Sequence, residues 1–209
     1  MGESKQDCST LATLQDIHAK ECKESEALAA ELCEQDRVHE ADEPLRKALV
    51  IREKYLGPHH PEVATSLNQL GGVFLAQGDY AHAEPTFRRA LAIREKQLGD
   101  SVETAESLGS LAEMLRSQGE NDMAEPLFRR SLAMYEKRLG TEHVEVAISL
   151  NNFASFLDSV GKTKEALCLI QRAVHIFDTE LGEKNMKTKI ANSWMDHLEK
   201  KLATEGDHK

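Results

Sequence analysis

The sequence is short of several residue types, and each shortage excludes a class of protein. Of 209 residues, 5% are aromatic, five are proline and four are cysteine. Apolar runs extend only a few residues, whereas a membrane span needs roughly 18. Glycine and proline are too scarce for collagen. The hydrophobic share of 40% is nevertheless too high for a disordered chain. A helical, soluble protein remains.

Positive charge is also in short supply. Lys plus Arg number 26 against 36 Asp plus Glu, giving a net charge of −10. Because nucleic-acid binding needs a basic face, we expect no nucleic-acid partner. The cysteines, Cys8, Cys22, Cys33 and Cys168, are irregularly spaced, which predicts neither disulfides nor a zinc site. The segment 1–13 lacks the apolar core of a secretory signal, so we expect a cytoplasmic protein without a membrane anchor.

Motifs for catalysis are missing as well. We find no phosphate-binding P-loop, no dinucleotide fingerprint, no nucleophile elbow and no zinc-protease motif. His59 and His60 have no third metal ligand nearby in the sequence. Cys33 and His39 lack an orienting acid for a nucleophile–base pair. We therefore expect no enzyme activity, and neither catalytic residues, a metal nor a cofactor.

An internal repeat organises the sequence. A Leu-Gly pair recurs with steps of 42, 41 and 42 residues. The short step falls in a loop, where one residue fewer leaves the helices unchanged. The pairs are Leu56-Gly57, Leu98-Gly99, Leu139-Gly140 and Leu181-Gly182.

Each period predicts two amphipathic helices. In the clearest one, Leu67, Leu70, Gly71 and Phe74 follow the i, i+3, i+4, i+7 spacing of one helix face. A turn glycine, Gly78, ends this first helix, and a second helix follows. The later periods keep turn glycines and small residues at matching positions. The first period has Asp36 in place of the glycine and Ser25 in place of a large residue, as a degenerate terminal repeat would.

The expected domain plan follows these periods. A lead-in helix or flexible segment precedes the repeats, and an amphipathic helix carrying Ile190, Trp194, Leu198 and Leu202 caps them, with Trp194 in its core. The expected boundaries are 1–21 for the lead-in, 22–185 for the repeats (22–63 degenerate, 64–104, 105–146 and 147–185), 186–203 for the cap and 204–209 for a frayed tail.

These periods resemble the tetratricopeptide repeat (TPR). The match consists of large–x–x–large–small, then a turn glycine, then small and aromatic positions, as in Gly78-Asp79-Tyr80-x-x-Ala83-Glu84-Pro85. The long period is similar to kinesin light chain and nephrocystin repeats. The resemblance implies an all-α fold, a right-handed TPR superhelix (α-solenoid) of helix-turn-helix repeats. Only about twenty residues precede the repeats, too few for the coiled coil of a kinesin light chain, so kinesin heavy chain binding is not implied.

The resemblance also implies a concave face lined by the first helix of each repeat. We expect Asn68 and Asn151 to clamp a peptide backbone, since an amide both donates and accepts hydrogen bonds. Gly109 interrupts this series, and solvated polar residues remain an alternative. The predicted peptide-binding residues are Thr65, Asn68, Leu75, Glu106, Glu113, Arg116, Ile148, Asn151, Ser155 and Asp158.

Two functional hypotheses remain open. In the first, the chain is an adaptor or scaffold that binds a short peptide in this groove with roughly micromolar affinity. Acidic groove residues favour a basic or mixed-charge peptide, and the carboxylate clamp for chaperone tails is absent. In the second, the convex face or a terminal repeat serves self-association or docking to a larger complex.

Overall fold

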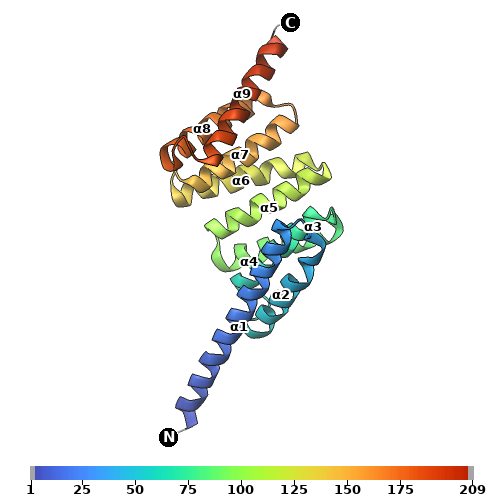
Figure 1. Ribbon diagram of the computed structural model, residues 1–209, viewed down its shortest axis with the longest axis vertical. Helices are drawn as coiled ribbons and strands as arrows, with labels where there is room; N and C mark the ends of the chain where they lie inside the picture. Colours follow the sequence, from blue (N-terminus) through green and yellow to red (C-terminus); the bar gives the residue numbers. More distant parts are fainter. Residues whose placement is uncertain (1–2, 207–209) are drawn as a thin grey trace. The chain divides into compact units, whose positions relative to one another are not determined.

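The computed structural model describes the backbone of residues 3–206 and the side chains of residues 17–204. This part of the chain is helical and contains no strand (Figure 1). The chain divides into two compact units, Met1–Gly99 and Asp100–Lys209. The elements are α1 (Glu3–Glu34), the 3-10 turn η1 (Val38–Glu40), α2 (Asp42–Leu56), α3 (Pro61–Ala76), α4 (Tyr80–Leu98), α5 (Val102–Gln118), α6 (Asn121–Leu139), α7 (Val144–Ser159), α8 (Thr163–Leu181) and α9 (Met186–Gly206).

Helices pack as consecutive antiparallel hairpins within each unit. In the first unit, α1 pairs with α2 and α3 with α4, and α2 also packs against α3. In the second, α5 pairs with α6 and α7 with α8, while α6 packs on α7 and α8 on α9. The odd-numbered member of each hairpin is called helix A below, and the even-numbered member helix B. This arrangement is the repeat packing that the sequence period predicts.

Local signals set the helix ends. The His60 and His143 side chains accept hydrogen bonds from backbone amides two residues later, and so cap α3 and α7. The turn glycine Gly78 has φ 73°, a left-handed conformation that glycine adopts without strain. Asp36, at the same place in the first repeat, has φ 60°. The degenerate repeat therefore keeps the turn geometry without glycine.

Both ends of the described backbone are helical, and two prolines lie inside helices. α1 is one continuous helix from Glu3 to Glu34, which crosses the expected boundary between the lead-in and the repeats. Pro85 and Pro126 lie inside α4 and α6, and both helices continue through them. The C-terminal helix α9 runs to Gly206, and residues 207–209 of the expected frayed tail lie outside the described part.

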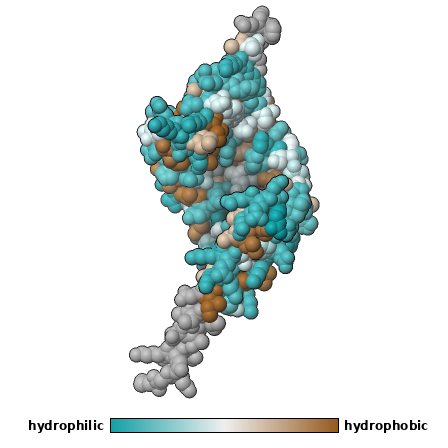
Figure 2. Space-filling model, in the orientation of Figure 1, coloured by the Kyte–Doolittle hydropathy of each residue, from teal (hydrophilic) through white to brown (hydrophobic). Residues whose placement is uncertain are grey.

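Three apolar residues are less buried than their pattern predicts. Leu28 is 49% exposed and Ile190 is 60% exposed, and Trp194, expected in the core of the cap, is only half-buried. Leu198, on the same helix as Trp194, is fully buried. The periodicity correctly predicts which residues share a helix face, but burial also needs a neighbouring helix on that face. The surface is otherwise largely hydrophilic in the view of Figure 2.

Small residues bring helices A and B together. Ala83, Ala124 and Ala166 on the B helices are fully buried. On helix A of the α3–α4 hairpin, Gly71 lies against the Phe87 ring so closely that an added Cβ would be 2.9 Å from Phe87 Cε1. Any side chain at position 71 must therefore displace a buried ring.

Two neighbouring glycines provide a matched test of this contact. We expect Gly71→Ala to destabilise the fold by about 1–3 kcal/mol, because Phe87 has to shift in a packed core. Gly72→Ala should instead stabilise it by roughly 1 kcal/mol, because nothing lies within 4 Å of an added Cβ and alanine favours the helix. Urea denaturation followed by circular dichroism measures both. Equal effects of the two substitutions would contradict the proposed close packing.

Candidate functional site

The helix A residues predicted to bind peptide differ in accessibility in the first unit. Thr65 and Leu75 on α3 are half-buried, and Thr65 Oγ1 accepts a hydrogen bond of 3.2 Å from the buried Arg94 guanidinium. Asn68 is only 8% exposed. Its amide therefore reaches little solvent in this structure, and a peptide could contact it only at its edge.

A depression of about 450 Å³ nevertheless lies on this helix A face of the first unit. It contains none of the predicted residues Thr65, Asn68 and Leu75. Small side chains on the facing turns of α1 and α3 leave the space open, and Gly72 contributes no side chain at all. The lining residues are Glu26, Ala29, Ala30, Cys33, Val38, Leu45, Gln69, Gly72, Val73 and Ala76.

Glu26, which lines this depression, belongs to a largely buried ion pair. Glu26 occupies the same repeat position as Asn68 and Asn151, but its carboxylate accepts two hydrogen bonds from the Arg52 guanidinium of α2. Arg52 also donates a bond of 2.5 Å to Ser66 Oγ on α3. Both members of the pair are largely buried. Arg52 thus links α1, α2 and α3, and the Glu26 carboxylate is already paired.

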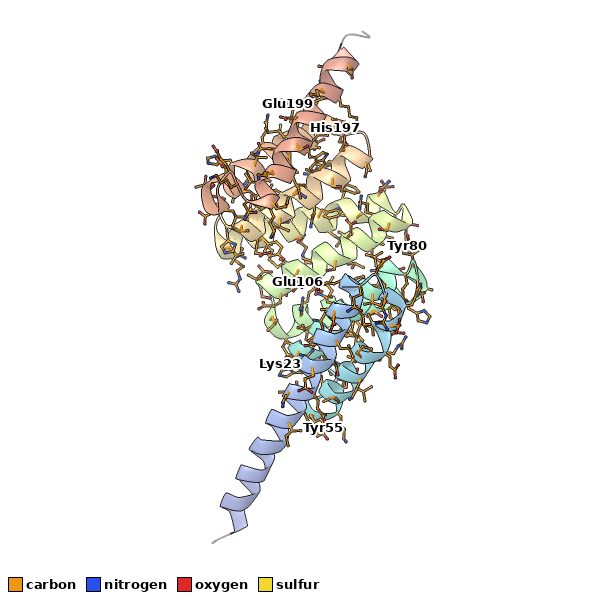
Figure 3. The ribbon with its side chains drawn as sticks, viewed as in Figure 1. Lys23, Tyr55, Tyr80, Glu106, His197 and Glu199 are labelled. Atoms are coloured by element: carbon orange, nitrogen blue, oxygen red, sulfur yellow. The ribbon has the colours of Figure 1, made fainter. Side chains whose placement is uncertain are left out.

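In the second unit, the α5 residues form a local charge pair. Glu113 and Arg116, both half-buried, are joined by two hydrogen bonds between carboxylate and guanidinium. Glu106, which lies about two turns before Glu113 on the same helix, is exposed (Figure 3). The pairing neutralises two of the charges that the sequence places on this face.

The α7 residues Ile148 and Asn151 line a depression of about 210 Å³ in the second unit. Phe177 of α8 and two residues of α9, Lys187 and Ile190, complete its lining. Asn151 is half-buried, so its amide faces a partly apolar recess. Two predicted site residues are therefore brought together here.

Sequence reasoning missed the contribution of α9 to this recess. The sequence places Ile190 on the amphipathic cap helix, and it follows Ile148 by one repeat period of 42 residues. It therefore occupies the same helix A position as Ile148, which accounts for its exposure. Extending the repeat register through α9 would have predicted this placement.

Asp158 and Ser155, the remaining predicted residues of α7, are half-buried. Asp158 holds neighbouring helices together, because its carboxylate accepts hydrogen bonds from Lys201 Nζ of α9 (2.7 Å) and Thr163 Oγ1 of α8 (2.9 Å). Burial raises the pKa of Asp158, but these two hydrogen bonds and the nearby positive charge of Lys201 together hold the pKa below its ordinary value. This carboxylate stabilises the attachment of α9.

The charges on the helix A faces are thus more balanced than the sequence suggests. Glu26, Glu113 and Asp158 are each paired with a cation from the same unit. Lys187 adds a positive charge beside Asn151. The acidic residues therefore give weaker grounds for a basic peptide than their number implies.

Within the described residues, no cluster of three or more His, Cys, Asp and Glu side chains is arranged to hold a metal ion. In the same part of the chain, no helix is long and apolar enough to cross a membrane.

The geometry defines an all-α protein of stacked helical hairpins. A family model described as tetratricopeptide repeat matches residues 21–96 and 103–179, the greater part of the chain. The chain belongs to the tetratricopeptide repeat family.

Curated relatives match over one short stretch. Nephrocystin-3 from Xenopus laevis and from Xenopus tropicalis are each 46% identical to this chain over 44 residues. This stretch is 21% of the present chain and 3% of either nephrocystin-3. The chain thus corresponds to a small part of these relatives.

Solved structures show the same fold over more of the chain. The nearly identical TPR-like repeats attributed to a kinesin light chain of Podosopora anserina superpose with a TM-score of 0.73 at 22% identity, covering 88% of both chains. BtubC from P. vanneervenii superposes with a TM-score of 0.66 at 21% identity, covering 77% of this chain and 65% of the BtubC chain. RapI without ligand superposes with a TM-score of 0.69 at 19% identity, covering 88% of this chain and 65% of the RapI chain. The expected fold class, an all-α tetratricopeptide solenoid, is confirmed.

The Asp158–Lys201 contact predicts a pH-dependent stability. A carboxylate with a lowered folded-state pKa stabilises the fold above its unfolded pKa, near 4, and this contribution is lost as the pH falls through the folded-state pKa. We expect Lys201→Met to lower the free energy of unfolding at pH 7, with the difference from wild type shrinking below about pH 4. Urea denaturation between pH 7 and pH 3 measures this.

The neighbouring Lys200, which is exposed, supplies the control. Lys200→Met should leave the free energy of unfolding nearly unchanged at every pH, as is usual for a surface position. A constant wild-type–Lys201→Met difference from pH 7 to pH 3 would contradict the role given to Asp158.

Proposed function

We propose that this chain is a non-enzymatic interaction module, an adaptor or scaffold, that binds a short peptide segment of a partner protein on its helix A face. Its family membership supports protein partners in general. The observation that carries the finer proposal is the recess beside Asn151, where an amide, a cation and apolar side chains converge. We place this activity in the cytoplasm.

The chemistry of the recess suggests which peptide fits. Ile148 and Ile190 offer apolar contact for one hydrophobic side chain of the ligand. The Asn151 amide can donate to a backbone carbonyl and accept from a backbone N–H. Lys187 favours a carboxylate or carbonyl oxygen nearby. We propose a mixed-charge segment with an apolar anchor residue.

The first unit, taken by itself, is proposed to offer a separate contact for a partner segment. Its depression of about 450 Å³ is mainly lined by small and apolar side chains. Gly72 adds no side chain to this depression, and nothing lies within 4 Å of a Cβ added there. Thr65, Leu75 and the edge of Asn68 lie on the same helix, and Glu106, Arg116 and Ser155 are proposed as peripheral contacts.

The proposal predicts a selective loss of binding. A peptide is first selected from a displayed library of short segments on the immobilised wild-type chain. Asn151→Ala should weaken its binding about tenfold, because the peptide backbone loses its amide partner. The Asn68→Ala/Asn151→Ala double variant should bind no more strongly than Asn151→Ala. Isothermal titration calorimetry measures the affinities.

Asn152→Ala is the matched control, since Asn152 is exposed, adjacent in sequence and absent from the recess lining. It should bind the selected peptide like wild type. Undiminished binding by both Asn151→Ala and the double variant would place the peptide site elsewhere.

A further inference from the structure

A second surface lies at the start of the repeats, where α1, η1 and α2 enclose a depression of about 840 Å³. We call it the N-terminal end face. Two leucines and a proline share its lining with polar and charged side chains. The lining residues are Ser25, Leu28, Leu32, Arg37, His39, Glu40, Asp42, Glu43, Pro44 and Lys47.

Leu28 in this face is exposed where its repeat equivalents are buried. It is 49% exposed, whereas Leu70 and Phe153, at the same helix A position, are 4% and 2% exposed. The Phe153 ring lies 5.9 Å from the Phe128 ring of the preceding helix B, and the Arg129 guanidinium lies over it at 5.1 Å. The position is thus one that a preceding helix covers in later repeats.

Lys47 shows the same deficit in charge pairing. Its equivalents Arg89 and Arg172 reach back to the preceding helix B, where they pair with Glu53 at 2.5 Å and Glu136 at 2.8 Å. Lys47 is exposed and forms no ion pair among the residues that the structure describes. In later repeats, the preceding helix B supplies partners at these two positions. At the end face, Leu28 and Lys47 are exposed instead.

The start of α1 differs from the starts of α3 and α7. In α3 and α7, the chain turns at His60 and His143, so that the preceding helix B packs alongside. The equivalent residue His18 lies inside α1, which continues without a break to Glu3 (Figure 1). α1 therefore extends roughly 22 Å beyond the position at which α3 and α7 begin.

The last helix, by contrast, has a polar outer face. Lys189, Asp196 and Glu199 of α9 are exposed and stand where α7 has the buried residues Ala147, Ala154 and Leu157. Figure 3 shows Glu199 and His197 on α9. A polar face of this kind ends a helical-repeat stack without attracting a further repeat. At the N-terminal end face, by contrast, the apolar Leu28 is exposed.

We infer that the N-terminal end face binds the same face of a second copy of this chain, forming a head-to-head dimer. Charge complementarity carries the choice of occupant: Glu43 and Lys47 lie one helical turn apart on α2, and neither forms an ion pair within the described chain. In a two-fold interface, Glu43 of each copy meets Lys47 of the other, and the Leu28 side chains bury one another. This interface is independent of the peptide site.

Sedimentation velocity over about 1–100 µM protein tests the proposal. Wild type should shift from monomer to dimer as its concentration rises. Leu28→Glu should remain monomeric, whereas Val50→Glu, at an apolar residue that is 62% exposed but outside the depression, should dimerise like wild type. Circular dichroism confirms that the variants fold.

Charge reversal tests the predicted pairing. Glu43→Lys and Lys47→Glu should each raise the dimer dissociation constant about tenfold, because like charges then face each other. An equimolar mixture of the two variants should form a heterodimer at least as tight as the wild-type dimer. A wild type that stays monomeric throughout, a dimer unaffected by Leu28→Glu, or a mixture that fails to associate would each overturn the inference.

Discussion

Close packing between helix A and helix B of one hairpin is the contact on which the rest of the structure depends. Fully buried alanines on the B helices, and the glycine at position 71 against the Phe87 ring, let paired helices approach closely. Since one face of each helix A is committed to its partner, its opposite face is left to line a surface. The recess at Asn151 is a consequence of that geometry.

Much of this fold follows from sequence because the determining contacts recur locally. The Leu-Gly period, the helix-face spacing and the turn glycines each depend on residues a few positions apart. Even the irregular first repeat was predictable, since Asp36 takes the left-handed turn conformation in place of glycine. The identity of the helix A face followed from the same register.

The accessibility of individual site residues was less predictable. Glu26 pairs with Arg52, which is 26 residues away, and Asp158 pairs with Lys201, which is 43 residues away. Such pairs depend on which side chain the adjacent helix presents, and helix periodicity carries no information on that. Asn68 is buried although its equivalent Asn151 borders a recess, for the same reason.

The proposed function depends most on peptide binding at the helix A recess of the second unit. Methyl NMR of isoleucine-labelled protein tests it most directly, because Ile148 and Ile190 line the recess while Ile170 is fully buried in the same unit. Titration with a library-selected peptide should shift the Ile148 and Ile190 methyl signals and leave Ile170 unmoved. Saturable binding that leaves both recess signals unchanged would contradict the claim.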